Sequence, residues 1–185
     1  MIRFNIDYLH REVKEYVNMN SKTKKLVMAA LFAAIACVAT AVLVIPIPST
    51  GGYLNMGDAV VLFGAFALGP VWGAAAGGIG SAMADVLLGY TAYAPGTLVI
   101  KGLTALAAGW LFQKTRRLGT VKTAVLSGIV GECIMVLGYF LYDSTLLGYG
   151  MAAAASIPAN SMQGLVGLVI GAVLAKSVLR RKQLI

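Results

Sequence analysis

Four charged side chains stand inside otherwise apolar stretches of this sequence and are its first candidates for chemistry: Asp58, Asp85, Lys101 and Glu132. A charge within hydrocarbon is costly, so such residues usually face a bundle interior or a watery cavity. We expect Lys101 to pair with Asp85 or Glu132. A structural ion pair and a ligand contact both stay open for Lys101, whereas the isolated carboxyl of Glu132 favours a functional role.

Neutral polar side chains accompany these charges. Asn160 and Gln163 are three residues apart and therefore share one face of a predicted helix. Most tyrosines suit an interfacial aromatic belt, but Tyr53 and Tyr93 fall in predicted loops beside the acidic groups. These groups indicate a pocket for a flat, polar, neutral or cationic ligand. The predicted ligand-binding residues are Tyr53, Asn55, Asp58, Asp85, Tyr93, Lys101, Glu132, Asn160 and Gln163.

The residues indicate binding and not catalysis. His10 is the single histidine, which argues against a His-based metal cluster and a Ser-His-Asp triad. The phosphate-binding pattern GxxxxGK[ST] does not occur, and Cys37 and Cys133 lie in apolar runs without a CxxC motif. We therefore predict no catalytic residue, no metal site and no cofactor.

Long apolar segments must position these groups. Hydrophobic residues make up 59% of the 185 residues and charged residues 12%, against about 25% charged residues in a typical soluble domain. Residues 26–45 form an uncharged run that as a helix would span roughly 30 Å, the thickness of a bilayer core. The sequence therefore predicts an integral membrane protein.

The basic residues indicate how the segments cross the membrane. They account for the net charge of +8 and cluster at 3–25, 114–122 and 176–182, beside apolar runs, as cytoplasmic anchors do. This placement argues against a nucleic-acid partner. The uncharged run between Asp58 and Asp85 is interrupted by Gly69-Pro70 and could form one long helix or two short ones. Only two helices place all three basic clusters on the cytoplasmic side of the membrane.

These considerations predict an all-α integral membrane bundle of six transmembrane helices with both termini in the cytoplasm. The expected helices are at about 26–45, 56–69, 71–89, 95–113, 123–142 and 157–176. Residues 23–185 form this domain. Residues 1–22 form a cytoplasmic segment, either an interfacial helix or a partly ordered extension.

Small residues recur at one-turn spacing on three of the predicted helices. Glycines at 69, 73 and 77, and again at 167 and 171, allow close helix approach in lipid. The first helix carries a stripe of alanines. From spacing alone this stripe packs either inside the bundle or against another protein, with the internal arrangement favoured; its members are Ala29, Ala30, Ala33 and Ala34.

Several motifs in order resemble a known family. They are Tyr53-Leu-Asn-Met-Gly-Asp58, Gly69-Pro-Val-Trp-Gly73, Gly80-Ser-Ala-Met-Ala-Asp85, Thr97-Leu-Val-Ile-Lys-Gly102 and Pro158-Ala-Asn160-Ser-Met-Gln163. Over about residues 24–180 the chain is similar to the substrate-binding S components of energy-coupling factor (ECF) transporters. The riboflavin-type and the pyrimidine or vitamin B6-type groups are the nearest in pattern.

The resemblance implies a function that composition does not. It implies six helices that bind a vitamin near the outer face of a prokaryotic plasma membrane, under the loop between helices 1 and 2. Riboflavin, pyridoxine and hydroxymethylpyrimidine all remain open as ligands. Transport would need a membrane coupling protein (T component) and two cytoplasmic ATPases, and the alanine stripe would be the docking face.

Two other classes compete with this interpretation. A stand-alone ion-coupled transporter could use Asp85, Lys101 and Glu132 as a proton relay, but the chain is short and shows no internal repeat. An intramembrane enzyme would need a nucleophile with a base, or a metal site, and the sequence offers neither.

Overall fold

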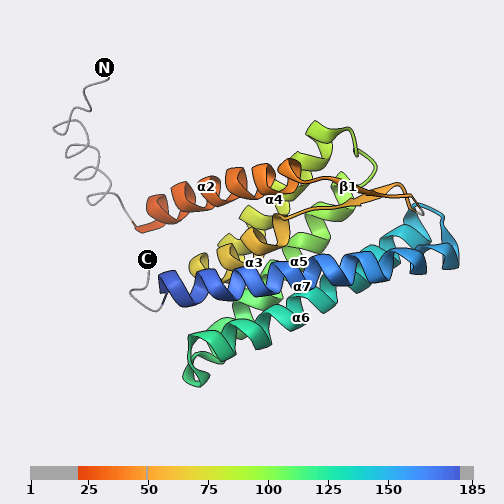
Figure 1. Cartoon of the computed structure of the whole chain (residues 1–185). Coiled ribbons are helices and arrows are strands. Elements are labelled where there is room, and N and C mark those ends of the chain that lie inside the picture. Colours follow the sequence, from red (N-terminus) through yellow and green to blue (C-terminus); the bar gives the residue numbers. More distant parts are fainter. Residues whose placement is uncertain (1–20, 49, 180–185) are drawn as a thin grey trace, which may run out of the picture.

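The computed structural model describes residues 21–48 and 50–179, drawn in Figure 1. Element labels follow that figure, so the first described helix is α2. Residues 1–20 of the predicted N-terminal segment (residues 1–22) lie outside the described part of the chain.

Long helices dominate the described residues, and the predicted helical bundle is confirmed in its main lines. The helices are α2 (Ser21–Val42), α3 (Gly57–Leu68), α4 (Pro70–Leu88), α5 (Ala94–Lys114), α6 (Thr120–Leu141) and α7 (Ile157–Leu174). Shorter helical turns cover Arg116–Leu118, Tyr142–Leu146, Gly150–Ser156 and Ala175–Leu179. The run between Asp58 and Asp85 forms two helices, as predicted, while α2 lies earlier in the chain than the predicted 26–45.

Five of the described helical segments are long and apolar enough to cross a membrane. The helix α3 is shorter, because its 12 residues extend only about 18 Å. The chain is thus a multi-pass membrane protein.

The short helix α3 is the centre of the bundle and packs against α2, α4, α5 and α7. Nine of its residues are buried, including Val61, Leu62 and Phe66. Gly69, with a φ of 83°, turns the chain directly from α3 into α4, a conformation that favours glycine. Gly73 then lies against Ala65 and Gly77 against Val61, so the predicted glycine stripe is an internal packing surface.

The alanine stripe on α2 divides between two environments. Ala29 is buried beside Phe32 and Ala76, and the Ala33 carbonyl lies against Gly80 of α4. Ala30 and Ala34 are exposed. The four-alanine docking face stays a prediction: Ala29 packs inward between α2 and α4, Ala33 is half-buried there, and Ala30 and Ala34 present their side chains outward.

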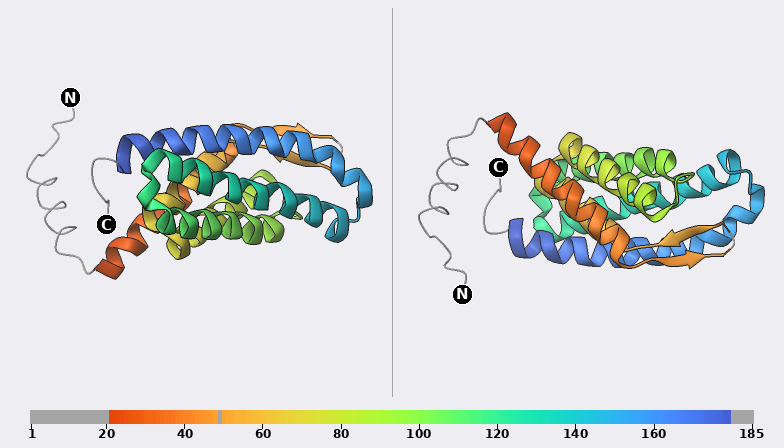
Figure 2. Two further views of the ribbon diagram at one scale, coloured as in Figure 1. Left: turned by 90° about the horizontal axis from the view of Figure 1, so that it is seen from below. Right: turned by 90° about the horizontal axis from the view of Figure 1, so that it is seen from above.

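A β-hairpin follows α2 and was not predicted. Strands β1 (Ile45–Ile47) and β2 (Gly52–Leu54) pair antiparallel, with Ile45 opposite Leu54 and Ile47 opposite Gly52. The two prolines at 46 and 48 suggested a loop, but a two-stranded ribbon has free edges on which proline needs no ladder hydrogen bond. The hairpin lies beside α7 at the end of the bundle away from the chain termini (Figure 2).

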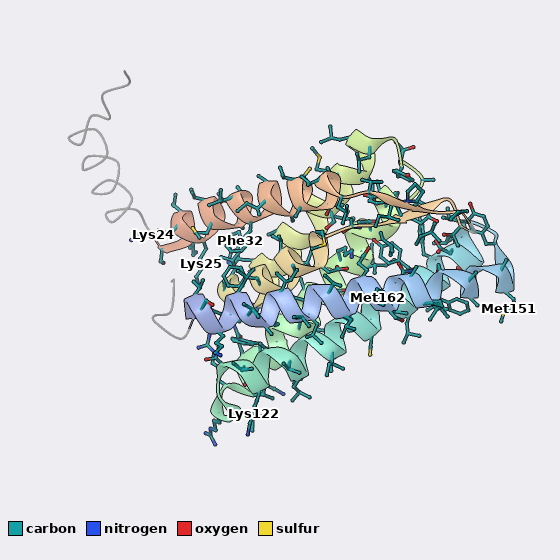
Figure 3. The ribbon with its side chains drawn as sticks, in the orientation of Figure 1. Lys24, Lys25, Phe32, Lys122, Met151 and Met162 are labelled. Atoms are coloured by element: carbon teal, nitrogen blue, oxygen red, sulfur yellow. The ribbon has the colours of Figure 1, made fainter. Side chains whose placement is uncertain are left out.

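The two ends of the bundle differ in charge. Lys24, Lys25 and Lys122 lie at the end where the described chain begins and finishes, whereas Met151 marks the opposite, hairpin end (Figure 3). The other described basic residues outside the bundle interior lie in the segments that meet at the first end, at 22, 114–117 and 176. The hairpin end is instead rich in tyrosine, which suits a membrane interface.

Candidate functional site

A small polar cavity lies beneath the hairpin. Its walls come from the hairpin, the ends of α2 and α4, the start of α5 and the hairpin-side parts of α6 and α7. The lining residues are Thr40, Ile47, Thr50, Gly52, Tyr53, Asn55, Ser81, Asp85, Tyr93, Thr97, Lys101, Tyr139, Asp143, Asn160 and Gln163. Segments far apart in sequence thus meet around one polar space inside an apolar bundle.

An ion pair forms the floor of this region. Lys101, 1% exposed, pairs with Asp58, which is fully buried at the start of α3. The prediction that Lys101 pairs with Asp85 or Glu132 is wrong. The short helix α3 brings Asp58 to the same depth as Lys101, and Gln163 completes the arrangement by donating its Nε2–H to Asp58 Oδ2 at 2.6 Å.

The same glutamine holds the chain that follows the hairpin. Gln163 Oε1 accepts a hydrogen bond from the Asn55 backbone N–H at 2.7 Å, and Asn55 Oδ1 caps Gly57 N–H at 2.8 Å. A continuous set of hydrogen bonds therefore links the hairpin, α7, α3 and α5. Both functional groups of the Gln163 amide are used, which fixes its orientation.

Two tyrosines fasten the hairpin over the cavity. The Tyr53 hydroxyl donates to Asp85 Oδ1 at 2.6 Å, and the Tyr93 hydroxyl donates to the Thr50 carbonyl at 2.7 Å. Burial and the neighbouring Asp85 raise the pKa of the Tyr53 phenol, and burial raises the pKa of Tyr93. Both hydroxyls therefore keep their protons and remain donors near neutral pH.

Two carboxyl groups at the cavity retain free acceptor capacity. Asp85 Oδ2 and Asp143 Oδ1 are buried and accept no hydrogen bond from the described residues, and the hydroxyls of Thr40 and Ser81 are likewise unpartnered there. A buried polar atom without a partner is costly and calls for an explanation. A ligand that donates hydrogen bonds would supply one.

Asp143 is a site residue that the sequence analysis missed. It follows predicted helix 5 and so looked like an ordinary loop aspartate, but α6 runs on into the turn Tyr142–Leu146 and buries it. Its other oxygen, Oδ2, is 3.5 Å from Ser156 Oγ. A lone carboxylate next to Tyr139 and Tyr142, in a half of the chain with few charges, was the available signal.

Most predicted site residues meet at this cavity. Tyr53, Asn55, Asp85, Tyr93, Lys101, Asn160 and Gln163 line it, and Asp58 lies directly behind Lys101. Glu132 is not among them, because its side chain lies against Gly164, in a separate groove between α6 and α7. The proposed relay of Asp85, Lys101 and Glu132 is therefore not brought together as one chain of contacts among the described residues.

Aromatic rings give the cavity flat walls. Tyr53 and Tyr90 pack with ring centroids 4.4 Å apart, and Tyr139 bonds Thr97 at 2.9 Å through its hydroxyl. Lys101 Nζ lies 5.5 Å from the Tyr139 ring centroid, within the range of a cation–π contact. The remaining space measures about 30 Å³, room for only one or two water molecules.

The comparisons with known proteins assign the family. A model of the family described as "ECF-type riboflavin transporter, S component" matches residues 20–180. The chain belongs to the S-component family of ECF transporters. The predicted resemblance is thereby confirmed.

Two relatives align with most of this S component. An uncharacterized protein from Pyrococcus woesei, from the gap 3' region, is 40% identical over 134 residues, covering 72% of this chain and 87% of the relative. The thiamine precursor transporter HmpT of Lactococcus lactis is 28% identical over 162 residues, covering 87% of this chain and 91% of HmpT.

Solved structures of S components share the fold. The S component for biotin of an ECF-type ABC transporter superposes with a TM-score of 0.66 at 14% identity, covering 89% of this chain and 95% of that one. The S component of a bacterial ECF transporter gives a TM-score of 0.63 at 18% identity, covering 87% and 98%. At this identity the likeness concerns the fold alone.

Proposed function

We propose that this S component captures a small, flat vitamin or vitamin precursor from outside the cell and delivers it to an ATP-driven ECF importer. The observation that carries the proposal is the enclosed polar cavity under the hairpin, with free carboxyl oxygens on Asp85 and Asp143. A largely apolar chain retains such groups in its interior only for a specific purpose.

The charges around the cavity favour a ligand that donates hydrogen bonds and carries no anionic group. The positive charge of Lys101 is neutralised by Asp58, so the carboxyls of Asp85 and Asp143 set the character of the space. Both offer a free oxygen, which an N–H or O–H of a ligand can satisfy. An anionic ligand would instead meet two carboxyls.

These features rank the candidate ligands. Hydroxymethylpyrimidine combines a flat ring with an amino and a hydroxyl group, and it would match both free carboxyl oxygens. The relationship to the thiamine precursor transporter HmpT points the same way. Pyridoxine is the second choice, and riboflavin is the third because its ring system is much larger than the present cavity.

Ligand capture requires the hairpin to move. Small-molecule pockets measure roughly 300–1,000 Å³, whereas about 30 Å³ is free beneath the hairpin. Three hydrogen bonds hold it down: Tyr53 to Asp85, Tyr93 to Thr50, and Asn55 to Gln163. We infer that the ligand replaces some of these contacts and that the hairpin then closes over it.

The proposed topology places the hairpin end outside a prokaryotic plasma membrane. The basic end would lie in the cytoplasm, which gives six helices with both termini inside. The short helix α3 would complete its crossing of the membrane through the residues that precede it. The exposed alanines Ala30 and Ala34 would face the T component, which couples the S component to two ATPases. Ala29 and Ala33 would support this face from inside the bundle.

A direct binding experiment tests the ligand. The purified chain should bind hydroxymethylpyrimidine more tightly than pyridoxine or riboflavin in isothermal titration calorimetry, and small molecules that copurify with it should be identified by mass spectrometry. Measurable preference for an anionic vitamin such as biotin would contradict the charge argument. Ligand uptake that persists in cells without the T component and ATPases would contradict the ECF assignment of transport.

A pair of variants tests the docking face. Ala34→Trp should leave folding and ligand affinity unchanged because this side chain is exposed, but it should abolish copurification with the T component. Ala33→Trp should destabilise the isolated subunit by about 1–3 kcal/mol, since the half-buried Ala33 packs against the cluster of Ala29, Phe32 and Ala76. Retained complex formation by Ala34→Trp would move the docking surface elsewhere.

A further inference from the structure

A second hollow lies on the side of the bundle formed by α6 and α7. It measures about 410 Å³ and opens outward between the two helices, with walls that are mostly aliphatic, from Ile129 and Val136 on α6 to Leu165 and Leu168 on α7. The lining also includes Gly164, Cys133 and Ser161, and the small size of these residues leaves the hollow unfilled. We call this hollow the α6–α7 groove.

Glu132 is the charged residue that lines the α6–α7 groove. It is 7% exposed, and neither Oε1 nor Oε2 accepts a hydrogen bond from the described part of the chain. A side-chain carbon added at Gly164 would lie 2.9 Å from Oε2, so only glycine leaves room for the carboxyl there. Glu132 is about 18 Å along α6 from Thr120 and about 14 Å from Leu141, near mid-membrane depth.

A carboxyl in this position must be offset by some partner. Leaving a polar group buried without a hydrogen bond costs free energy, and ionisable groups within a membrane are retained for function. The groove has the size and character of a small-molecule site: a space of several hundred Å³, apolar walls and a single well-placed polar group. Since it opens on a lipid-facing side, its occupant must reach it through the membrane.

We propose that the α6–α7 groove binds a membrane-dissolved amphiphile with a medium-length alkyl chain and one hydrogen-bond-donating head group, an alcohol or a primary amine. The chain packs along Ile129, Val136, Leu165 and Leu168, and the head group donates to the Glu132 carboxyl. This site is separate from the cavity under the hairpin, which Glu132 does not line.

Two observations favour such a molecule over a helix of a partner protein. The exposed alanines proposed for docking are on α2, which packs on α3 and α4 and not on the groove helices. The groove is a hollow with one carboxyl at its base, and large exposed side chains such as Leu137 and Leu165 flank it. A surface that packs against a partner helix is usually a flat stripe of small residues instead.

Photolabelling in lipid nanodiscs tests the proposal. The probe is a ten-carbon alcohol with a diazirine at mid-chain, and its comparator carries the same chain and diazirine but ends in a methyl group. Labelling by the alcohol should concentrate on residues 129–137 and 161–168 and be displaced by 1-decanol. Glu132→Leu should lower this labelling about ten-fold, the effect of losing one hydrogen bond to the carboxyl, and leave the comparator unchanged.

Two control variants keep the test decisive. Ser127→Ala removes another unpartnered buried polar group on α6 that does not line the groove, and it should change nothing. Cys133→Trp should fill the groove and remove labelling by both probes, with folding intact because Cys133 is exposed. Equal labelling of α2, α4 and α5, or alcohol labelling unchanged in Glu132→Leu, would overturn the proposal.

Further measurements on the same preparations test whether the groove and the vitamin-binding cavity act independently. Affinity for hydroxymethylpyrimidine should stay the same in Glu132→Leu, so failure at one site leaves the other unaffected. Groove labelling that disappears when the chain is assembled with its T component would assign the groove to a partner helix and overturn the proposal.

Discussion

The cavity under the hairpin and the α6–α7 groove both contain buried carboxyl oxygens without a partner, but they differ in what surrounds them. At the cavity, the hairpin covers Asp85 and Asp143, and the nearby Lys101 is already neutralised by Asp58. In the groove, mostly aliphatic side chains surround Glu132, and no described group hydrogen-bonds its carboxyl oxygens. The same functional group is thus offered to water-soluble molecules at one site and to lipid-soluble molecules at the other.

The comparison also separates a paired from an unpaired buried carboxyl at similar depth. Asp58 has Lys101 and Gln163 as partners, and Glu132 has none among the described residues. We expect the paired carboxyl to stabilise its neighbours only while the pair is intact, and the unpaired one to reduce stability as it stands. The substitutions that follow test this contrast and the difference between the cavity and the groove.

The largest effect is expected when the pair is broken. Lys101→Met leaves Asp58 buried without its countercharge and should lower the free energy of unfolding by about 3–5 kcal/mol. Reversible unfolding in detergent micelles measures it. Adding Asp58→Asn to Lys101→Met should recover most of the loss, and a stable single variant would contradict the importance of the ion pair.

The next effect concerns ligand affinity and should appear at only one of the two sites. Asp143→Leu should weaken binding of a donor ligand at the cavity at least ten-fold, because a hydrogen bond to a charged group is lost. Glu132→Leu should change that affinity less than two-fold. Calorimetry on both variants checks the contrast, and equal losses would mean that the groove and the cavity act as one site.

A smaller effect of opposite sign is expected in the groove. Glu132→Leu replaces an unpartnered buried carboxyl with an apolar side chain of similar volume and should raise the free energy of unfolding by about 1–3 kcal/mol. Unfolding in the absence of added amphiphile measures this gain. Destabilisation by Glu132→Leu would reveal a partner for the carboxyl within the folded subunit.

The smallest effect is expected at the hairpin. Tyr93→Phe removes the hydrogen bond to the Thr50 carbonyl and keeps the ring against Gly52, so stability should fall by about 0.5–1.5 kcal/mol. Stopped-flow binding should show faster ligand association, since the hairpin is held less firmly. A slower association rate would mean that the hairpin does not have to move before the ligand binds.

Much of the bundle could be predicted from the sequence because its signals are local. The uncharged runs and the Gly69-Pro70 break depend on adjacent residues, and they correctly indicated where the helices lie, although not every helix end. The site was harder, since the partner of Lys101 depends on how far a short helix carries Asp58 into the bundle. Spacing along one chain cannot choose among three carboxyls on three different helices.

The errors have similar causes. Asp143 was overlooked because a helix end was placed one residue before it, and a buried turn then looked like solvent-exposed loop. The role of Ala33 stays a prediction, because a small residue suits any close contact, and the structure shows only that its backbone lies against Gly80. Glu132 drew attention as a carboxyl at mid-membrane depth, but the helix face on which it lies was not predictable.

The ion pair of Lys101 and Asp58 has an electrical consequence. Moving one elementary charge across a potential of 100 mV is worth about 2.3 kcal/mol, so an unpaired lysine inside a membrane protein responds to voltage. Lys101 and Asp58 are in contact and carry opposite charges, so the voltage exerts no net force on them as a unit. Any tilting of the subunit that keeps the pair together would therefore move no net charge of theirs and leave the membrane potential undisturbed.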